Sequence, residues 1–233
     1  MSKATNSRAI ARDAQIEVIK DVARRLIAEK SVSGLSLREV SREMGLVSSA
    51  LYRYFATRDD LLTALILDAY NDLGQSVERA GARVARADAY ARWRASARAI
   101  RRWATKNPHG YALIYGTPIP GYAAPKETIE AAARVARVLG AILSENRRTA
   151  ARSAPKHSKG SDVGRYLKLE GLAAIMPGVA PEEYLKALMA WTTIFGFLTF
   201  ELFGQYVGSV KNASLMFDRV VDELAVSLNL KAV

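Results

Sequence analysis

The sequence of 233 residues contains no cysteine and only two histidines. The lack of cysteine excludes disulfide bonds and thiol chemistry, and so few metal-binding side chains predict no transition-metal site. No HExxH, GxSxG or P-loop pattern occurs, so the residues indicate neither a catalytic function nor a bound cofactor. No alternating strand pattern persists, and Asn-Gly and Asp-Gly turns are missing, which predicts a chain built from helices.

Two kinds of apolar segment are also missing. The first fifteen residues contain no apolar core of the kind that a signal peptide has. The longest uncharged apolar stretch, residues 187–200, is shorter than a helix that spans a bilayer, and Glu201 closes it. These features predict a soluble, cytoplasmic protein without a membrane partner.

Residues 34–62 carry the most informative pattern of the chain. Ser36 and Glu39, three residues apart, form a capping box in front of a first short helix. Gly45 lies just past the end of that helix, where glycine most easily adopts a left-handed cap. Two short helices joined by a tight turn with glycine are typical of the helix-turn-helix, whose second helix enters the major groove of DNA.

The second short helix is expected over residues 49–55, with Ser48 as its N-terminal cap. Leu51 and Phe55 lie four residues apart on this helix, so their side chains share one face and are expected to be buried together. Thr57, with an acidic residue three positions later, marks the start of the next helix. The opposite face of the second short helix is therefore expected to face outward.

The sequences GLSLREVSREMG, SSALYRYF and TRDDLL resemble the N-terminal DNA-binding domain of the TetR family of transcriptional regulators, over about residues 10–65. The resemblance implies that the second short helix reads an operator in double-stranded DNA. An arginine there can pair with guanine, whereas a tyrosine hydroxyl more often holds a phosphate. The small residues at positions 48–50 offer few hydrogen bonds to base edges. The resemblance assigns DNA contact to Ser36, Arg38, Ser48, Ser49, Ala50, Tyr52, Arg53, Tyr54 and Arg58.

The rest of the chain is expected to be helical, with an irregular segment at residues 117–124 and a polar loop at residues 153–164. Caps and apolar periodicity place helices at about residues 7–28, from 58 past 69, 88–106, from 108, 125–149, 181–207 and 211–228. The predicted fold is all-α, with about nine to ten helices. A helix-turn-helix head is expected at residues 1–56 and a helical regulatory and dimerisation bundle at residues 57–233.

The helix expected after Pro181 is apolar nearly all round, so it must be covered on nearly all sides. One explanation is burial within a single subunit. The other is a homodimer, in which the last two helices of two copies form a four-helix interface with two-fold symmetry. The family resemblance favours the homodimer, because one short recognition helix reads few bases alone.

Residues 102–122 resemble the regulatory domain of the WHG-type subgroup, with Trp103, His109 and Gly116 at the positions of its three letters. The resemblance implies a ligand-binding unit, and apolar walls with a few polar groups suit a small hydrophobic effector. The alternative is that the aromatic residues are core and that His109 only starts a helix. The expected pocket residues are Trp103, Tyr111, Ile114, Tyr115, Trp191 and Phe195.

The formal net charge of +11 lies mainly outside the helix-turn-helix, because residues 78–110 hold nine lysines or arginines and two acidic residues. Two arginine sets follow a four-then-three spacing, which places each set on one helix face. These faces are expected to be solvated, and the alternatives are an added field near DNA or recruitment of an acidic ligand. The sets are Arg79, Arg83 and Arg86, and Arg94, Arg98 and Arg101.

These observations predict a homodimeric repressor that a small hydrophobic effector releases from a pseudo-palindromic operator. The effector would act by binding one conformer better than the other. The alternative is a sequence-tolerant, architectural DNA-binding protein whose basic faces hold the duplex without a specific effector. The effector, the operator sequence and the choice between repression and activation do not follow from the residues.

Overall fold

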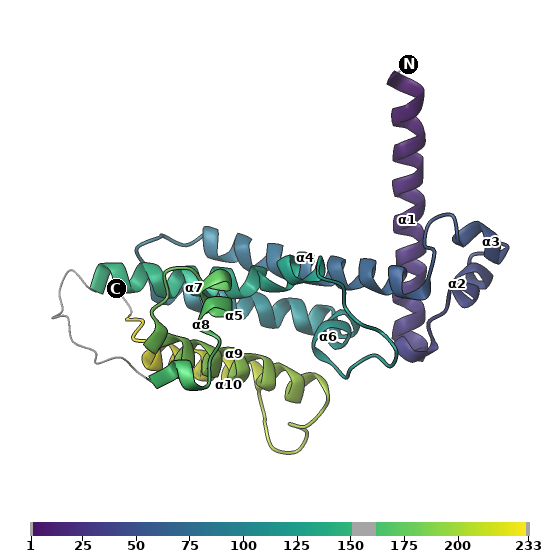
Figure 1. Cartoon of the computed structure of the whole chain (residues 1–233). Coiled ribbons are helices and arrows are strands. Elements are labelled where there is room, and N and C mark those ends of the chain that lie inside the picture. The colour runs from purple at the N-terminus through teal and green to yellow at the C-terminus, as the bar shows by residue number, and fades with distance from the viewer. Residues whose placement is uncertain (1, 151–161, 232–233) are drawn as a thin grey trace. The chain divides into compact units, whose positions relative to one another are not determined.

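The computed structural model describes residues 2–150 and 162–231, and within these ranges every regular element is a helix (Figure 1). The predicted all-helical fold is therefore confirmed. The described α-helices are α1 (Ser2–Lys30), α2 (Leu37–Glu43), α3 (Ser48–Leu51), α4 (Arg58–Ala82), α5 (Ala89–Lys106), α6 (Pro108–Tyr115), α7 (Thr128–Ala150), α8 (Leu169–Ile175), α9 (Pro181–Leu202) and α10 (Ala213–Ser227). Two short 3-10 helices are η1 (Val32–Gly34) and η2 (Asp162–Arg165).

The structure corrects several predicted helix ends. α7 begins at Thr128 rather than at Pro125, because the Pro125 carbonyl accepts hydrogen bonds from the Thr128 backbone nitrogen at 3.1 Å and from its Oγ1 at 2.7 Å. α9 ends at Leu202, because Gly204 then adopts a left-handed φ of 77°. The sequence pattern does not predict α8, whose seven residues are too few to show a clear periodicity. The predicted polar loop lies outside the described residues up to residue 161.

Contacts between residues divide the chain into two compact units. The first unit consists of Met1–Ala69 and His109–Ile129, and the second of Tyr70–Pro108 and Glu130–Val233. α4 runs through the division, so its first half belongs to one unit and its second half to the other. Each unit is therefore built from two separate stretches of the sequence.

The core of the first unit holds together the helices of the helix-turn-helix. Ile19, Val22, Leu26 and Ile27 are buried along one face of α1. The predicted burial of Leu51 and Phe55 is confirmed, because both belong to the same core cluster. Helices as short as α2 and α3 are not stable alone, so packing with α1 in this core cluster holds them in place.

The segment 109–129 contributes to this core, although it lies far along the sequence. Leu113, Ile119 and Tyr122 pack against the core cluster of the first unit. The hydroxyl groups of Tyr122 and Thr63 lie 2.9 Å apart and form a hydrogen bond. The irregular segment predicted at residues 117–124 is present, and Ile119 and Tyr122 from it pack against the core of the first unit.

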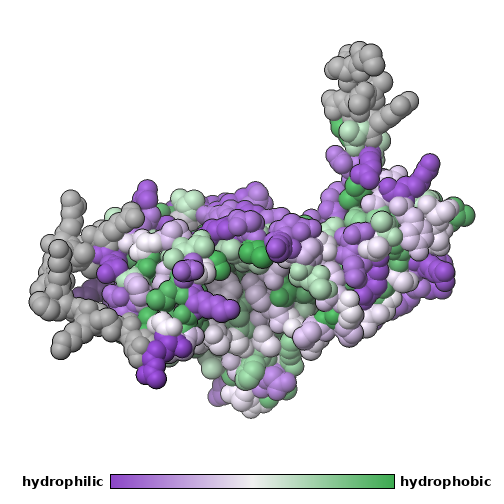
Figure 2. Space-filling model, in the orientation of Figure 1, coloured by the Kyte–Doolittle hydropathy of each residue, from purple (hydrophilic) through white to green (hydrophobic). Residues whose placement is uncertain are grey.

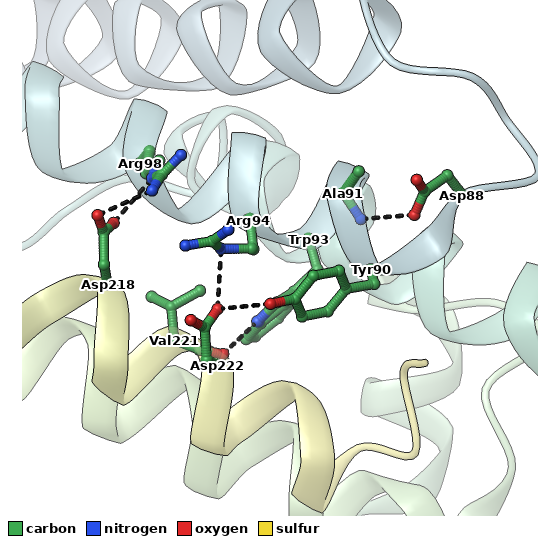
Figure 3. A network of polar contacts seen from close by, with 9 residues as sticks. All are labelled: Asp88, Tyr90, Ala91, Trp93, Arg94, Arg98, Asp218, Val221 and Asp222. Atoms are coloured by element: carbon green, nitrogen blue, oxygen red, sulfur yellow. Dashed lines mark hydrogen bonds and ion pairs between the residues drawn. The ribbon is translucent and has the colours of Figure 1, made fainter. Parts of the chain in front are cut away.

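In the second unit, α5, α9 and α10 pack against one another (Figure 1). Trp93 is buried, and its indole nitrogen donates a hydrogen bond of 2.9 Å to the carbonyl of Val221. Three arginines of α5 pair with carboxylates of the two last helices, and Figure 3 shows the pairs made with α10. The pairs are Arg94 with Asp222 at 2.8 Å, Arg98 with Asp218 at 2.7 Å and Arg101 with Glu201 at 2.5 Å.

This arginine ladder, Arg94, Arg98 and Arg101, corrects the expectation of a solvated face. The spacing on one helix face is as predicted, but each guanidinium is partly buried and compensated within the chain. In the other set, Arg79 and Arg83 are exposed, and Arg86 pairs with Glu145 at 2.6 Å. The ladder therefore joins helices and contributes little free positive charge.

We expect the ladder to make the stability of the second unit sensitive to acid. Arg98 donates two hydrogen bonds to Asp218 and holds the pKa of that carboxyl below its ordinary value. A carboxyl with a lowered folded pKa stabilises the fold above its unfolded pKa, and this contribution is lost as the pH falls through the folded value. We expect Asp218→Asn to reduce the free energy of unfolding at neutral pH by about 1 kcal/mol, because the pair is only partly buried.

Urea unfolding followed by circular dichroism, from about pH 7 down to about pH 3, measures this effect, and the variant should lose less stability than the wild type on acidification. The matched control is Glu223→Gln, because Glu223 also lies on α10 but pairs with Arg219 in solvent, with side chains 60% and 76% exposed. The control should follow the wild-type curve. If Glu223→Gln lowered the free energy of unfolding at neutral pH as much as Asp218→Asn does, the ladder would have no special role in stability.

Candidate nucleic-acid interface

The cap at the start of α2 is confirmed, in half of its predicted form. The Ser36 hydroxyl accepts a hydrogen bond of 3.1 Å from the backbone nitrogen of Glu39. The Glu39 carboxylate does not return to the cap, because it pairs with Lys30 at 2.5 Å and with Arg42. The hydrogen bond from Lys30 lowers the pKa of Glu39 below its ordinary value. Ser36 therefore has a structural role, and DNA contact by it stays a prediction.

The turn after α2 has the conformation that its glycine predicts. Gly45 adopts a φ of 65°, in the left-handed region that glycine enters at little cost. The backbone nitrogen of Leu46 donates a hydrogen bond of 2.9 Å to the carbonyl of Ser41, which closes the turn. Leu46 and Val47 are then exposed, Val47 by 72%.

The predicted cap and length of the second short helix are wrong. α3 has only four helical residues, and the residue at its cap position is Val47, whose side chain accepts no hydrogen bond. The Ser48 hydroxyl lies 3.1 Å from the hydroxyl of Ser41 instead, so it joins α3 to α2. After Leu51 the chain continues as a turn in which the nitrogens of residues 54 and 55 both donate to the Leu51 carbonyl.

The structure divides seven of the nine predicted DNA-contact residues between two environments. Exposed on the surface are Arg38, Ser49, Tyr52 and Arg53. Partly buried are Ser48, Ala50 and Tyr54, of which Tyr54 packs against the core of the first unit. The exposed group lies on α2 and on α3 with the turn that follows, so the two elements together present an outward surface.

Arg58 is held inside the first unit. Its Nε donates a hydrogen bond of 2.9 Å to the carbonyl of Leu35, and its Nη2 donates one of 3.1 Å to the carbonyl of Val32. Its remaining Nη1 lies 3.6 Å from the carboxylate of Asp59. These contacts explain Arg58 as a tie between the start of α4 and the residues before α2, and phosphate binding by it stays a prediction.

The start of α4 carries a complete capping box. The Asp60 nitrogen donates to the Thr57 hydroxyl at 3.1 Å, and the Thr57 nitrogen donates to the Asp60 carboxylate at 2.9 Å. The predicted pairing of these two residues is therefore confirmed. These two hydrogen bonds fix the point at which the turn after α3 passes into α4.

One residue that the sequence analysis does not identify is Arg12 of α1. Its Nη2 lies 3.4 Å from the carbonyl of Arg53, to which it donates, and its guanidinium lies 5.8 Å from the centre of the Tyr54 ring. Arg12 thus adds an exposed positive charge beside the turn that carries Tyr52 and Arg53. No local pattern identifies it, because the contact joins residues 41 positions apart.

The residues expected to line a ligand pocket are divided between the two units. Tyr111, Ile114 and Tyr115 belong to the first unit, and Trp103, Trp191 and Phe195 to the second. Ring contacts join Tyr111 to Tyr115, with centroids 5.3 Å apart, and Trp191 to Phe195, with centroids 4.4 Å apart. The Trp103 indole donates a hydrogen bond of 2.7 Å to Asp72. A role of these side chains in ligand binding stays a prediction.

Two further residues of the predicted regulatory motif have clear local environments. His109 is exposed in the first turn of α6. Gly116 follows the last residue of α6, and a Cβ atom there would lie 2.2 Å from the carbonyl oxygen of Ala112. Glycine is therefore required at position 116 for the chain to leave the helix in this direction.

Both parts of the chain match known families. Residues 19–65 match the family described as bacterial regulatory proteins, tetR family, and residues 93–224 match the tetracyclin repressor-like, C-terminal domain. The first match contains α2, α3 and the four exposed residues of the outward surface, Arg38, Ser49, Tyr52 and Arg53. The second contains most of α5, all of α9 and most of α10.

Individual proteins are similar over most of the chain. The HTH-type transcriptional regulator Rv1816 of Mycobacterium tuberculosis is 39% identical over 206 residues, which is 82% of each chain. The crystal structure of the putative regulatory protein SCO4313 has a TM-score of 0.76 at 33% identity and covers 93% of this chain and 97% of that one. PfmR of Thermus thermophilus, described as a TetR family transcriptional regulator, shares the fold with a TM-score of 0.59 at 19% identity, over 88% of this chain and 96% of that one.

Proposed function

This chain belongs to the TetR family of DNA-binding transcriptional regulators, and we propose that it is a homodimeric repressor that a small hydrophobic effector releases from a pseudo-palindromic operator. The family consists of regulators rather than enzymes. We also propose that the protein is soluble and works in the cytoplasm, where operator DNA is found.

The observation that carries the proposal is the outward surface of α2 and α3. Arg38, Ser49, Tyr52 and Arg53 are exposed there, while the inner faces of the same elements are anchored in the core of the first unit. A rigid support with exposed polar side chains is what base and phosphate contacts require. These four residues are the proposed DNA contacts, with Arg53 as the candidate for pairing with guanine.

Dimerisation is proposed from the exposed apolar face of α9. Leu185, Met189 and Phe200 of α9, and Phe203 directly after it, are between 41% and 58% exposed and fall on one side at helical spacing. Gly196, also exposed, lies among them and would allow another helix to approach closely, because no atom beyond its chain neighbours and the nearby backbone of α9 lies within 4 Å of where its Cβ would be. Figure 2 shows apolar patches that interrupt the polar surface in the region of α8 and α9.

The opposite face of α9 is already covered within the chain, since Ile194, Phe197 and Leu198 are buried. By length and composition alone α9 could also cross a membrane, a criterion that the core helices of soluble proteins satisfy as well. Exposed apolar residues continue on α10, with Leu215 at 67% and Val226 at 71%. A second copy would cover both helices at once in a four-helix interface.

The proposed effector site uses the predicted aromatic residues of the second unit, Trp103, Trp191 and Phe195. An effector shifts an equilibrium only if it binds one conformer better than the other. α4 supports such coupling, because one continuous helix belongs to both units. The chemistry of the effector follows from the apolar character of the predicted lining, which suits a hydrophobic or aromatic small molecule.

The alternative of a sequence-tolerant DNA-binding protein loses one of its supports. It relies on basic faces outside the helix-turn-helix, and three of those arginines are paired with carboxylates in the arginine ladder. Paired, partly buried charges release few counterions from DNA and add little to nonspecific affinity. The small residues at the start of α3 still favour weak direct readout by hydrogen bonds.

Selection of bound duplexes from a random DNA library by the full chain, at near-physiological salt, tests the proposed function. We expect a motif with two-fold symmetry and half-sites about one helical turn or more apart. The selected duplex then serves to screen hydrophobic compounds for release. Retention of every duplex to the same extent, with steep loss of binding as salt increases, would support the sequence-tolerant alternative instead.

A further inference from the structure

The turn between α2 and α3 exposes two adjacent apolar side chains. Leu46 is 40% exposed and Val47 is 72% exposed, and they lie between α2 and the outward residues of α3. Both fall inside the region that matches the DNA-binding family. Figure 2 shows apolar surface at the edge of the view over the α2–α3 region. DNA is therefore the partner that this surface meets in the proposed function.

The Val47 side chain is mostly exposed in the free protein. It occupies the cap position of α3, where serine, threonine, aspartate or asparagine would stabilise the helix by a hydrogen bond. Valine accepts no such bond, and most of its surface is in water. A residue that breaks a local rule at a binding surface is often retained for the interaction made there.

The side chains next to Val47 supply few hydrogen bonds to bases. The Ser48 hydroxyl is engaged with Ser41, and Ala50 has no polar group. Ser49 is exposed but offers only a single hydroxyl, which bonds to several bases and distinguishes them poorly. The start of α3 therefore presents a mainly apolar surface to a base pair.

The only apolar group that a base pair of ordinary DNA presents in the major groove is the 5-methyl group of thymine. We propose that Val47 packs against the 5-methyl group of one thymine in each half-site and so determines sequence preference at that position. This inference rests on the proposed function, because it requires that α3 enters the major groove. It adds readout by shape and apolar contact to the few hydrogen bonds that the start of α3 can offer.

The test uses the duplex selected by the full chain, with each thymine replaced in turn by deoxyuridine, which lacks only the methyl group. We expect one thymine position in each half-site to be sensitive. Replacing that thymine in one half-site should weaken wild-type binding by about fourfold, the effect of leaving one methyl group unburied. The other replacements should have little effect. Val47→Ala should bind the thymine and deoxyuridine duplexes equally, because the side chain that senses the methyl group is shortened.

A second variant separates recognition from folding. Val47→Ser supplies a cap hydroxyl, so it should raise the thermal midpoint while it also abolishes the difference between thymine and deoxyuridine. The matched control is Val18→Ala on α1, an exposed valine of the first unit that should keep the wild-type sensitivity to deoxyuridine.

The outcomes distinguish the inference from the proposed function. A symmetric selected motif whose affinity does not change with any deoxyuridine replacement would overturn the role of Val47 alone. The same conclusion follows if Val47→Ala keeps the wild-type sensitivity. Selection without any preferred sequence would overturn the proposed function, and the inference with it.

Discussion

Replacing Tyr52 and Arg53 together by alanine should weaken binding to the selected operator by about 100-fold or more, because each good side-chain contact to a base contributes about 1–3 kcal/mol. Both side chains are exposed, Tyr52 by 51%, so their removal leaves no cavity in the core of the first unit. The contact of Arg12 with position 53 is made to the backbone carbonyl and survives the change. Fluorescence anisotropy at fixed salt measures the affinity, and thermal unfolding checks the fold.

The matched control for this double variant is Arg25→Ala, which removes an exposed positive charge from α1 in the same unit. It should lower affinity slightly and to the same extent for every DNA sequence. Repeating the titrations at several salt concentrations adds a second readout, because each lost phosphate contact reduces the slope of log K against log salt by about 0.9. Operator affinity unchanged in the double variant would rule out the assignment of the recognition surface.

Placing two glutamates on the exposed face of α9, as Met189→Glu with Phe200→Glu, should make the protein monomeric, because the change disrupts the proposed dimer interface. The two side chains are 58% and 52% exposed in the free chain, so the variant should fold, but in the proposed interface four unpaired charges would be buried. Operator affinity should fall by about 100-fold or more, because the two half-sites are no longer bound jointly. Light scattering after size exclusion measures the mass.

Ile129→Glu is the control for this variant. Ile129 is 56% exposed, but it belongs to the first unit and not to α9. It should remain dimeric and bind the operator as the wild type does. A double-glutamate variant that keeps the mass of a dimer would place the interface elsewhere. A monomeric variant with full operator affinity would instead contradict the need for a dimer in DNA recognition.

Features that depend on neighbouring residues could be predicted from the sequence. The caps at Ser36 and Thr57, the left-handed Gly45 and the burial of Leu51 with Phe55 each follow from positions at most four residues apart. Such features are fixed by backbone geometry and helix periodicity. They were sufficient to locate the helix-turn-helix and its outward face.

Features that depend on tertiary packing could not be predicted in this way. The spacing of Arg94, Arg98 and Arg101 shows that they share a helix face, but their carboxylate partners lie at least 100 residues away, so solvation was the simpler explanation. Ser48 is a good cap by type, yet α2 lies close enough for its hydroxyl to meet that of Ser41. In both places a distant partner overrides the local preference.

The return of residues 109–129 to the first unit has a consequence for exchanging parts between related regulators. A head excised at Ala69 would keep the whole helix-turn-helix but lose Leu113, Ile119 and Tyr122, which cover its core. A chimera joined at a single point would therefore pack the core of one protein's first unit against residues 109–129 of another protein. A swap that preserves packing must transfer two separate pieces of sequence at once, so recombination at one crossover is expected to give poorly folded hybrids even between close relatives.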